Sequence, residues 1–300
     1  MVRTDGVLVV NKPAGPTSHD VVAVARRALG IARIGHTGTL DPLATGVLPL
    51  VVGKATRLAA YLTADEKEYI ATVRFGATTA TYDAEGAREP TASGHPPIDA
   101  AAIVSALPAF VGTYLQQPPP YSAKKVEGIP AYKLAREKKP VAIKPVEVTV
   151  RELELRRYAA GTAELRIVSS SGFYVRSLAH DLGERLGCGA YLEALERSRA
   201  GDFTLENARP LADIVAAGAS ARDWVVPMER LLTRMAAVTL TDEGAKRASH
   251  GNVLRLRDFA GDPRSSGPEG PKRLLDQSGD LVGIAEPREG GLLHPVVILV

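Results

Sequence analysis

The chain has 300 residues, of which 45% are hydrophobic and 24% charged, an ordinary balance for a globular protein with room for two domains. Its single cysteine, Cys188, excludes an internal disulfide framework and a multi-cysteine metal site, and fits a reducing compartment. No stretch approaches the ~20 apolar residues of a membrane span, and no signal-peptide pattern opens the sequence. We therefore expect a cytoplasmic protein without a membrane partner.

Positive charge is concentrated in one segment, residues 124–144. The formal net charge of the chain is +3, whereas this segment alone carries +5 and leaves the remainder slightly acidic. A charge run is usually a solvated face, but a basic run also suits the phosphates of a nucleic acid. Composition leaves both interpretations open.

The N-terminal region predicts a strand followed by a helix. Residues 6–10 form a short apolar run that ends in a proline-containing turn at residues 11–13, which is typical of a buried strand. Ser18 is a candidate N-cap and Gly30 a candidate residue just past the helix end. Apolar residues recur at helical spacing between them.

Residues 35–49 form a loop around a single carboxylate, Asp41. Pro42 has a fixed φ angle and disfavours the helical region for Asp41, while glycines at 35, 38 and 46 permit positive φ angles and close backbone approach. The apolar side chains of the run are able to bury its underside. This combination predicts a rigid, mostly apolar cradle with one acid at its tip, although an isolated Asp-Pro pair is usually an ordinary turn.

The middle of the chain interleaves strands and helices without regular βαβ repeats. Residues 116–121 must be extended, because three consecutive prolines cannot continue a helix. The pattern predicts an α+β fold with a mixed or antiparallel sheet. Strands are expected at residues 69–75, 146–150 and 163–167, and helices at residues 98–110, interrupted by Pro108, and after Arg176, closed by Gly187.

After about Leu232 the sequence changes to short strand candidates separated by turns. Residues 261–273 contain eight Gly, Pro or Ser residues, which predicts a mobile loop. We expect a small β-rich appendage in this part of the chain. The strand candidates lie at residues 238–240, 253–256, 281–284 and 295–300.

The full run from Gly35 to Pro49 closely resembles the signature of the TruB family, the tRNA pseudouridine-55 synthases. The likeness extends to residues 6–12, 66–75, 121–136 and 171–189. It implies a pseudouridine synthase catalytic domain over residues 1–232 with a basic RNA-binding insertion at about 108–145, and a PUA-like RNA-binding domain over residues 233–300.

The resemblance implies that the protein isomerises the uridine at position 55, in the T-loop of tRNA, to pseudouridine. The reaction breaks the N1–C1′ glycosidic bond, turns the base and rejoins it through C5. No electron is exchanged and no group is added, so neither a cofactor nor a metal is expected, and the sequence has no Cys/His ligand cluster and no P-loop. The implied partner is tRNA with its target uridine flipped out, and no obligate protein partner is expected.

The resemblance also implies roles for individual residues. Asp41 matches the catalytic aspartate, Arg176 the arginine placed against it, and Tyr69 the tyrosine that stacks on the target base. Read alone, Arg176 is a surface arginine and Tyr69 a core aromatic residue. The implied RNA contacts are His36, which the family inserts into the RNA fold, and Lys12, Arg57, Tyr174, Lys125, Lys138 and Lys139.

Several questions stay open at this level. Asp41 acts either as a nucleophile or as a base toward a sugar proton. The enzyme is either stand-alone, which the basic insertion and compact length favour, or a guide-RNA-dependent relative. A non-catalytic RNA-binding or tRNA-folding protein is the third reading, and the presence of Asp41, Tyr69 and Arg176 together argues against it. Ser198 stands where the family usually has a hydrophobic residue near the base pocket, and no role is assigned to it.

Overall fold

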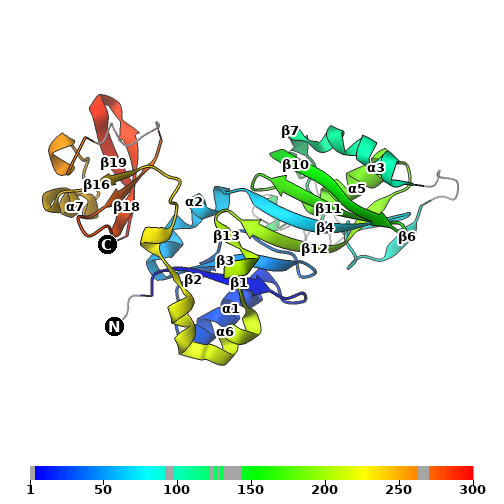
Figure 1. Ribbon diagram of the computed structural model, residues 1–300, viewed down its shortest axis with the longest axis horizontal. Coiled ribbons are helices and arrows are strands. Elements are labelled where there is room, and N and C mark those ends of the chain that lie inside the picture. Colours follow the sequence, from blue (N-terminus) through cyan, green and yellow to red (C-terminus); the bar gives the residue numbers. More distant parts are fainter. Residues whose placement is uncertain are drawn as a thin grey trace.

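The computed structural model describes residues 4–91, 98–121, 125–126, 129–130, 143–262 and 270–299. It contains one large mixed sheet flanked by helices and a second, four-stranded sheet near the C-terminus (Figure 1). The expectation of an α+β fold with a mixed sheet and a small β-rich C-terminal part is confirmed.

The large sheet has the strand order β14-β1-β3-β12-β4-β11-β10-β7. Most neighbours are antiparallel, but β12 pairs with β3, and β1 with β14, in parallel. The long strands are β1 (Gly6–Lys12), β3 (Thr45–Val52), β4 (Lys67–Phe75), β10 (Val146–Ala159), β11 (Thr162–Ser169) and β12 (Ala190–Ala200). The short strands are β2 (Ile34–His36), β7 (Gly112–Gln116), β13 (Phe203–Thr204), β14 (Arg209–Pro210) and β15 (Val226–Pro227). Two small hairpins, β5 (Ala77–Thr79) with β6 (Arg88–Pro90) and β8 (Lys125–Val126) with β9 (Ile129–Pro130), stand outside it.

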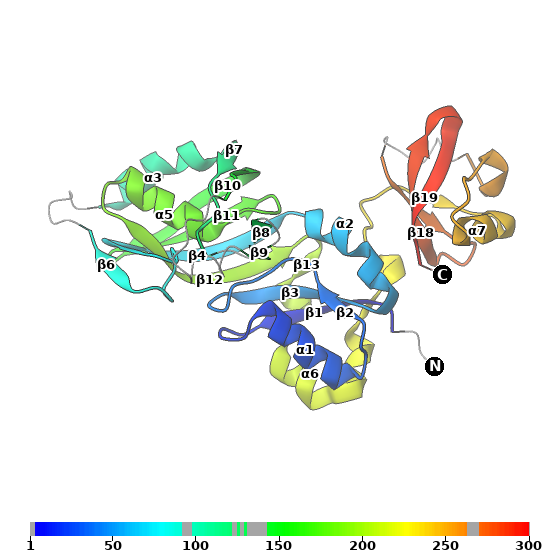
Figure 2. The ribbon, with the colours of Figure 1, turned by 180° about the vertical axis from the view of Figure 1, so that it is seen from behind.

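Helices cover the large sheet in two groups. In both ribbon views α1 and α6 lie side by side against the β1–β3 end, and α3 and α5 lie over the opposite end (Figures 1 and 2). The helices are α1 (Ser18–Leu29), α2 (Ala59–Ala64), α3 (Ala100–Ala106), α5 (Val175–Arg185) and α6 (Leu211–Ala217). The 3₁₀ turns are η1 (Gly53–Leu58), η2 (Leu107–Phe110), η3 (Leu205–Asn207), η4 (Gly218–Trp224) and η5 (Met228–Arg230).

The start of α1 differs from the prediction by one residue. Thr17, not Ser18, is the N-cap: its side chain accepts the Asp20 amide, and the Asp20 carboxylate accepts the Thr17 amide. Ser18 is buried and hydrogen-bonds Leu40 in the Asp41 loop instead. The predicted end is confirmed, because Gly30 takes a left-handed φ of 64° and closes the helix.

The C-terminal sheet contains elements that the sequence pattern did not reveal. The predicted strand at 253–256 is wrong: only Leu254 makes a bridge, to Leu293, and a 3₁₀ turn, η6 (Leu256–Asp258), follows. The predicted loop at 261–273 ends too late, since its last two residues open a strand, and residues 263–269 of it lie outside the described residues. The elements are β16 (Ala237–Thr239), α7 (Asp242–Ser249), β17 (Lys272–Leu275), β18 (Leu281–Arg288), η8 (Glu289–Gly291) and β19 (Leu292–Ile298), with strand order β16-β17-β18-β19.

An apolar cluster joins the two sheets. Val7 and Val9 of β1 share it with Leu281 and Ile284 of β18 and with Leu299. These side chains are buried, so the C-terminal sheet packs on the large sheet through a hydrophobic contact and not through a polar linker alone.

Candidate active site

A cavity of about 210 Å³ lies between the Asp41 loop and the neighbouring strands β4 and β12, which line it with Lys67, Tyr69, Leu195 and Arg197. The start of α5 and the turn before it close the remaining side. The lining residues are Gly38, Thr39, Leu40, Asp41, Thr63, Lys67, Tyr69, Ser171, Gly172, Phe173, Tyr174, Val175, Arg176, Leu195 and Arg197. The site therefore combines apolar walls with one carboxylate and three cations.

Arg176, the second residue of α5, contacts both carboxylate oxygens of Asp41. Its Nε lies 2.9 Å from Asp41 Oδ2, and its second terminal nitrogen donates to Oδ1 at 3.2 Å. The arginine side chain is buried, whereas 33% of the Asp41 side chain stays exposed toward the cavity. The arginine fixes the orientation of the acid while leaving it accessible to a ligand.

A second carboxylate, Asp83, completes a buried charge network. Its Oδ2 lies 3.3 Å from Arg176, and its Oδ1 accepts the Thr81 hydroxyl at 2.6 Å and the Glu85 amide at 3.1 Å. Sequence reasoning missed Asp83, because nothing in its local pattern distinguishes it from an ordinary loop aspartate. Arg176 is thereby held between two acids that come from different parts of the chain.

The protonation of Asp41 is set by opposing effects. Desolvation raises the pKa of Asp41 above its usual value, and the nearby Asp83 raises it further. Arg176 is the main opposing influence, with a smaller contribution from Lys12. The arginine therefore helps to keep the acid ionised in a poorly solvated place.

Hydrogen bonds, a close backbone contact and apolar packing anchor the Asp41 loop, in agreement with the rigid loop predicted from the sequence. Ser18 Oγ accepts the Leu40 amide at 2.8 Å and donates to the Leu40 carbonyl at 3.0 Å. Gly46 has a φ of 98°, and a Cβ there would lie 2.3 Å from the Arg197 carbonyl oxygen, so only glycine permits this approach of β3 to β12. Leu40, Ala44 and Leu48 bury the underside.

Lys12 has a structural position, contrary to the expected phosphate contact. Its side chain is fully buried, and its Nζ donates to the carbonyls of Pro13 at 2.9 Å, Pro42 at 3.2 Å and Ala44 at 2.6 Å. Burial lowers the pKa of Lys12 to about 8, while Asp41 acts in the opposite direction. The ammonium group ties the end of β1 to the turn after Asp41 and is not presented to a phosphate.

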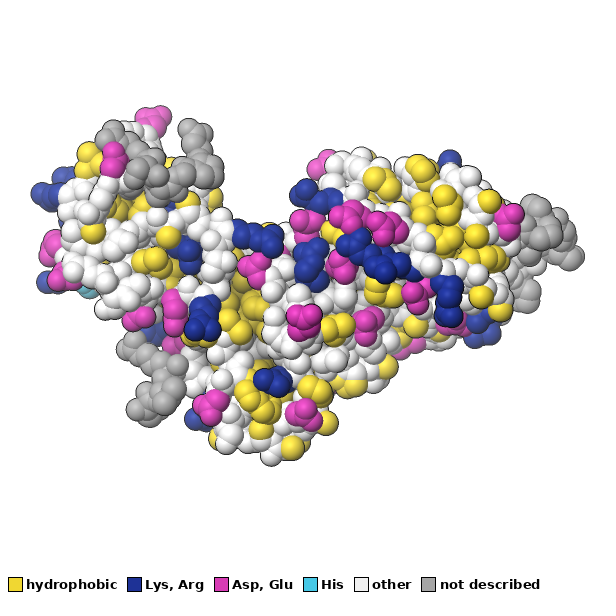
Figure 3. Space-filling model, viewed as in Figure 1, with side chains coloured by type: hydrophobic (Ala, Val, Ile, Leu, Met, Phe, Trp, Pro, Cys, Tyr) yellow, Lys and Arg dark blue, Asp and Glu magenta, His cyan; other side chains and the backbone are white. Residues whose placement is uncertain are grey.

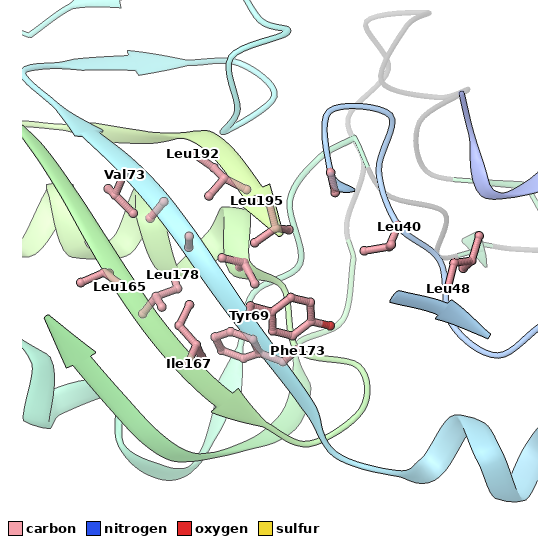
Figure 4. Close-up of a cluster of buried hydrophobic side chains, with 14 of the residues drawn as sticks. Leu40, Leu48, Tyr69, Val73, Leu165, Ile167, Phe173, Leu178, Leu192 and Leu195 are labelled. Atoms are coloured by element: carbon pink, nitrogen blue, oxygen red, sulfur yellow. The ribbon is translucent and has the colours of Figure 1, made fainter. Parts of the chain in front are cut away.

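Tyr69 stands on the cavity side of β4. Alternate β4 residues are buried, which places Lys67 and Tyr69 on one face and Glu68 on the other. Figure 4 shows the Tyr69 ring beside that of Phe173, with Leu195 nearby on the adjoining strand. Flat and apolar side chains thus form part of the wall of the cavity that Asp41 also lines.

Two further cations, Lys67 and Arg197, line the cavity and were missed by sequence reasoning. Arg197 is 1% exposed, and donates to the carbonyls of Val47 at 2.8 Å and Gly38 at 3.2 Å. Lys67 is 4% exposed, and its Nζ donates to the carbonyls of Thr63 and Asp65. The available signal was the alternation of β4, which puts a lysine on the same buried face as Tyr69.

Burial lowers the pKa of both cations. Desolvation, assisted by the neighbouring Arg197, brings the pKa of Lys67 to about 8, and Asp65 opposes the shift. The pKa of Arg197 is also lowered by burial, against the influence of the Tyr69 phenol, which interacts with it. At neutral pH both side chains remain positively charged.

Ser198 lies outside the cavity. Its hydroxyl donates to Glu68 Oε1 at 2.9 Å on the opposite face of the large sheet. The hydrophobic residue that β12 contributes to the cavity is Leu195, three residues earlier. Ser198 stands where the family usually has a hydrophobic residue, and because it lies outside the cavity this difference does not change the cavity lining.

The other expected RNA contacts lie around the cavity or away from it. Tyr174 lines the cavity, and its main chain is bonded to the Gln116 amide group. His36 is half-buried outside the lining, with its ring edge-on to His19 at 5.2 Å between ring centroids. Arg57 is exposed and donates to the Ile298 carbonyl. Lys138 and Lys139 lie outside the described residues, and only the backbone of Lys125 is described.

The outer face of the large sheet contrasts with the cavity side. Arg166 pairs there with Glu68 at 2.7 Å and with Glu152. Basic and acidic side chains are intermixed over the sheet in the space-filling view (Figure 3). In the part of the chain that the structure describes, no helix has the length and apolar character to cross a membrane.

Comparison with known proteins identifies relatives over the whole chain. Residues 26–175 match the N-terminal domain of the TruB family pseudouridylate synthases, residues 176–233 the C-terminal domain of tRNA pseudouridylate synthase B, and residues 236–299 the C-terminal part of pseudouridine synthase II TruB. The tRNA pseudouridine synthase B of Solibacter usitatus (strain Ellin6076) is 44% identical over 299 residues, 98% of this chain and 100% of the relative. That of Thermobifida fusca (strain YX) is 42% identical, with 98% of each chain covered.

Solved structures agree on the fold. An H/ACA RNP bound to a substrate RNA containing 2′-deoxyuridine has a chain with a TM-score of 0.75 and 24% identity, covering 99% of this chain and 86% of that one. A Cbf5-Nop10-Gar1 complex gives a TM-score of 0.72 at 26% identity, covering 95% of this chain and 78% of the other. With these matches over nearly its full length, the chain belongs to the TruB family of pseudouridylate synthases.

Proposed function

We propose that this protein isomerises the T-loop uridine of tRNA, position 55, to pseudouridine, with Asp41 as the catalytic carboxylate. The observation that carries the proposal is the cavity whose lining combines Asp41, held by Arg176, with Tyr69 and an apolar wall. Relatives that are 40–44% identical over nearly the full chain are named tRNA pseudouridine synthase B, which supports tRNA as the substrate.

Asp41 has two chemical routes open to it. As a nucleophile it would attack C1′ and form a sugar ester while the electron pair of the N1–C1′ bond moves to the base. As a base it would remove a sugar proton from the cation that the same cleavage produces. Both routes need an ionised, oriented carboxylate, which the contacts from Arg176 favour.

The target base would occupy the apolar part of the cavity. The Tyr69 and Phe173 rings and the Leu195 side chain supply flat and apolar surface for it, and stacking on an aromatic ring contributes roughly 1–3 kcal/mol per base. A stacked uridine reaches such a cavity only by leaving its stack, which costs a few kcal/mol. We assign to His36, at the loop outside the cavity, the role of occupying the space that the uridine vacates.

We assign the phosphate contacts to Lys125, Lys138, Lys139 and the exposed Arg57. The C-terminal sheet is assigned a further contact with the RNA. The protein is proposed to act in the cytoplasm. Replacing Lys138 and Lys139 by glutamine should weaken tRNA binding and make log Kd less steep against log salt concentration, by about two released counterions. An unchanged slope, measured by filter binding, would show that these lysines face solvent in the complex.

Two other functions compete. A guide-RNA-dependent synthase shares the fold, as the H/ACA structure indicates, but its chain is only 24% identical to this one. A non-catalytic RNA-binding protein would not require a carboxylate at the cavity held by a buried arginine. The relatives' names and the Asp41 geometry therefore favour the stand-alone enzyme.

The test is incubation of the purified protein with an unmodified tRNA transcript labelled with tritium at uridine C5. Release of tritium without any guide RNA or partner protein is the expected result, because C5 loses its hydrogen when it joins C1′. A uridine-to-cytidine change at position 55 is the matched control and should abolish release. A protein that releases tritium only when a guide RNA is added would overturn the stand-alone assignment.

A further inference from the structure

Lys67 and Arg197 form a pair of buried cations on one side of the cavity. They come from neighbouring strands, β4 and β12, whose register places Arg197 directly opposite Tyr69, two residues along from Lys67. Both line the cavity. The two cations and the Tyr69 ring therefore share one surface, which adjoins the Asp41 loop at Arg197.

Neither of these cations forms a direct ion pair with an acid among the described residues. Among the described residues, Lys67 donates to main-chain carbonyls, and Arg197 donates to main-chain carbonyls and interacts with the Tyr69 phenol. Neither forms an ion pair with a carboxylate there, and the acid that acts on Lys67 electrostatically is Asp65. Arg176, by contrast, lies between Asp41 and Asp83. Buried charges are usually paired because desolvation is costly, so two buried cations without that direct pairing beside a cavity favour an anion inside it.

The reaction of the proposed function produces such an anion. When the N1–C1′ bond breaks, its electron pair stays with the base, whose negative charge spreads over N1, O2 and O4. The sugar becomes cationic at C1′ and is captured by Asp41 or loses a proton to it. The charge on the base disappears when C5 uses an electron pair to bond C1′, which either breaks the sugar ester and releases the Asp41 carboxylate or is accompanied by return of the sugar proton from Asp41. The base is therefore anionic only between cleavage and rejoining.

We propose that Lys67 and Arg197 constitute an electrostatic site for the detached uracil anion, which stabilises cleavage and retains the base while it turns. The inference rests on the proposed function, which it deepens. Lys67 donates two hydrogen bonds to the carbonyls at the end of α2, and an ammonium group has three donors, so one remains for the cavity side. Arg197 also has a second role, because it tethers the Asp41 loop through Gly38 and Val47.

Lys67 therefore gives the cleaner test, with Lys67→Met removing the charge and Lys67→Arg preserving it. Single-turnover loss of the target nucleoside is followed by nuclease digestion and chromatography, with uridine or 5-fluorouridine at position 55 of the tRNA. Fluorine withdraws electrons and stabilises the detached base by itself. With uridine, Lys67→Met should react about 100-fold more slowly, Lys67→Arg within about tenfold of wild type, and tRNA affinity should stay unchanged.

The decisive readout is how much the loss in single-turnover rate differs between the uridine and 5-fluorouridine substrates. The penalty of Lys67→Met should shrink several-fold with 5-fluorouridine, which a merely structural role of Lys67 would not produce. Arg166→Met, which removes a cation from the opposite sheet face, is the matched control and should react like wild type with both substrates. Equal penalties for the two substrates, or a loss explained by weaker tRNA binding, would overturn the inference.

A folding defect and a failure of the proposed function are both separable outcomes. If Lys67→Met does not fold by circular dichroism, Lys67→Gln replaces it, because it also removes the charge, and it should show the same substrate-dependent penalty. Wild-type protein that is inactive on uridine-containing tRNA refutes the proposed function. Wild-type activity with equal penalties refutes only the site for the anion.

Discussion

The cavity has two charged sides that are built in opposite ways. On the Asp41 side, Arg176 lies between two carboxylates, whose combined negative charge exceeds its own positive charge. On the Tyr69 side, Lys67 and Arg197 are bound by main-chain carbonyls and keep their charge. A neutralised arginine positions an acid, whereas carbonyl-bound cations leave a positive field in a place of low dielectric constant. We therefore assign the orientation of the Asp41 carboxylate to the Arg176 side and the stabilisation of negative charge to the side with Lys67 and Arg197.

The strongest test of the Asp41 side is Asp41→Asn. The amide cannot attack C1′ or accept a sugar proton, so turnover should fall by at least ~10³-fold. The tritium-release assay measures it, and filter binding should show tRNA affinity unchanged. Turnover within tenfold of wild type would remove Asp41 from the mechanism.

Arg176→Met should cause the largest loss of stability. The substitution leaves buried Asp83 without its cation, which costs about 3–5 kcal/mol in the free energy of unfolding. Urea unfolding measures the change. The control is the double variant Arg176→Met/Asp83→Asn, which removes both charges and should recover more than half of that stability without recovering activity. No recovery would mean that the packing of Arg176, not its charge, matters.

Arg197→Met should cost less stability than Arg176→Met, about 1–3 kcal/mol. It leaves two carbonyls without a donor but no carboxylate without a partner. The same urea series compares the two arginines directly. Equal losses in the free energy of unfolding would show that stability does not depend on whether the buried arginine is paired with carboxylates or with carbonyls.

The smallest expected effect is on the pH dependence of the reaction. Activity requires the Asp41 carboxylate, so it should fall as pH decreases through the raised pKa of that group. Asp83 contributes to raising this pKa, so Asp83→Asn should move the acidic limb of the single-turnover profile to lower pH. Arg176→Lys keeps a cation beside the acid and serves as the comparison. A shift to higher pH in Asp83→Asn would contradict the electrostatic account of Asp41.

Local sequence determined the features that depend on neighbouring residues. The helix after residue 17, its glycine end at Gly30, the alternating strand at Tyr69 and the constrained loop around Asp41 follow from backbone preferences and side-chain periodicity. The family signature placed Arg176 and Tyr69 beside Asp41 as an expectation, and in the structure all three line one cavity.

Tertiary structure alone decided which charges meet and which are buried. Asp83 reaches Arg176 across 93 residues of sequence, and the β4–β12 register puts Arg197 opposite Tyr69. Lys12, expected at a phosphate, is enclosed by three carbonyls, one from Pro13 at the end of β1 and two from Pro42 and Ala44 after Asp41. Pairing between distant segments fixes burial and partners, and a local pattern contains no information about either. The same reason explains why α7 and β17, short elements stabilised by their neighbours, escaped prediction.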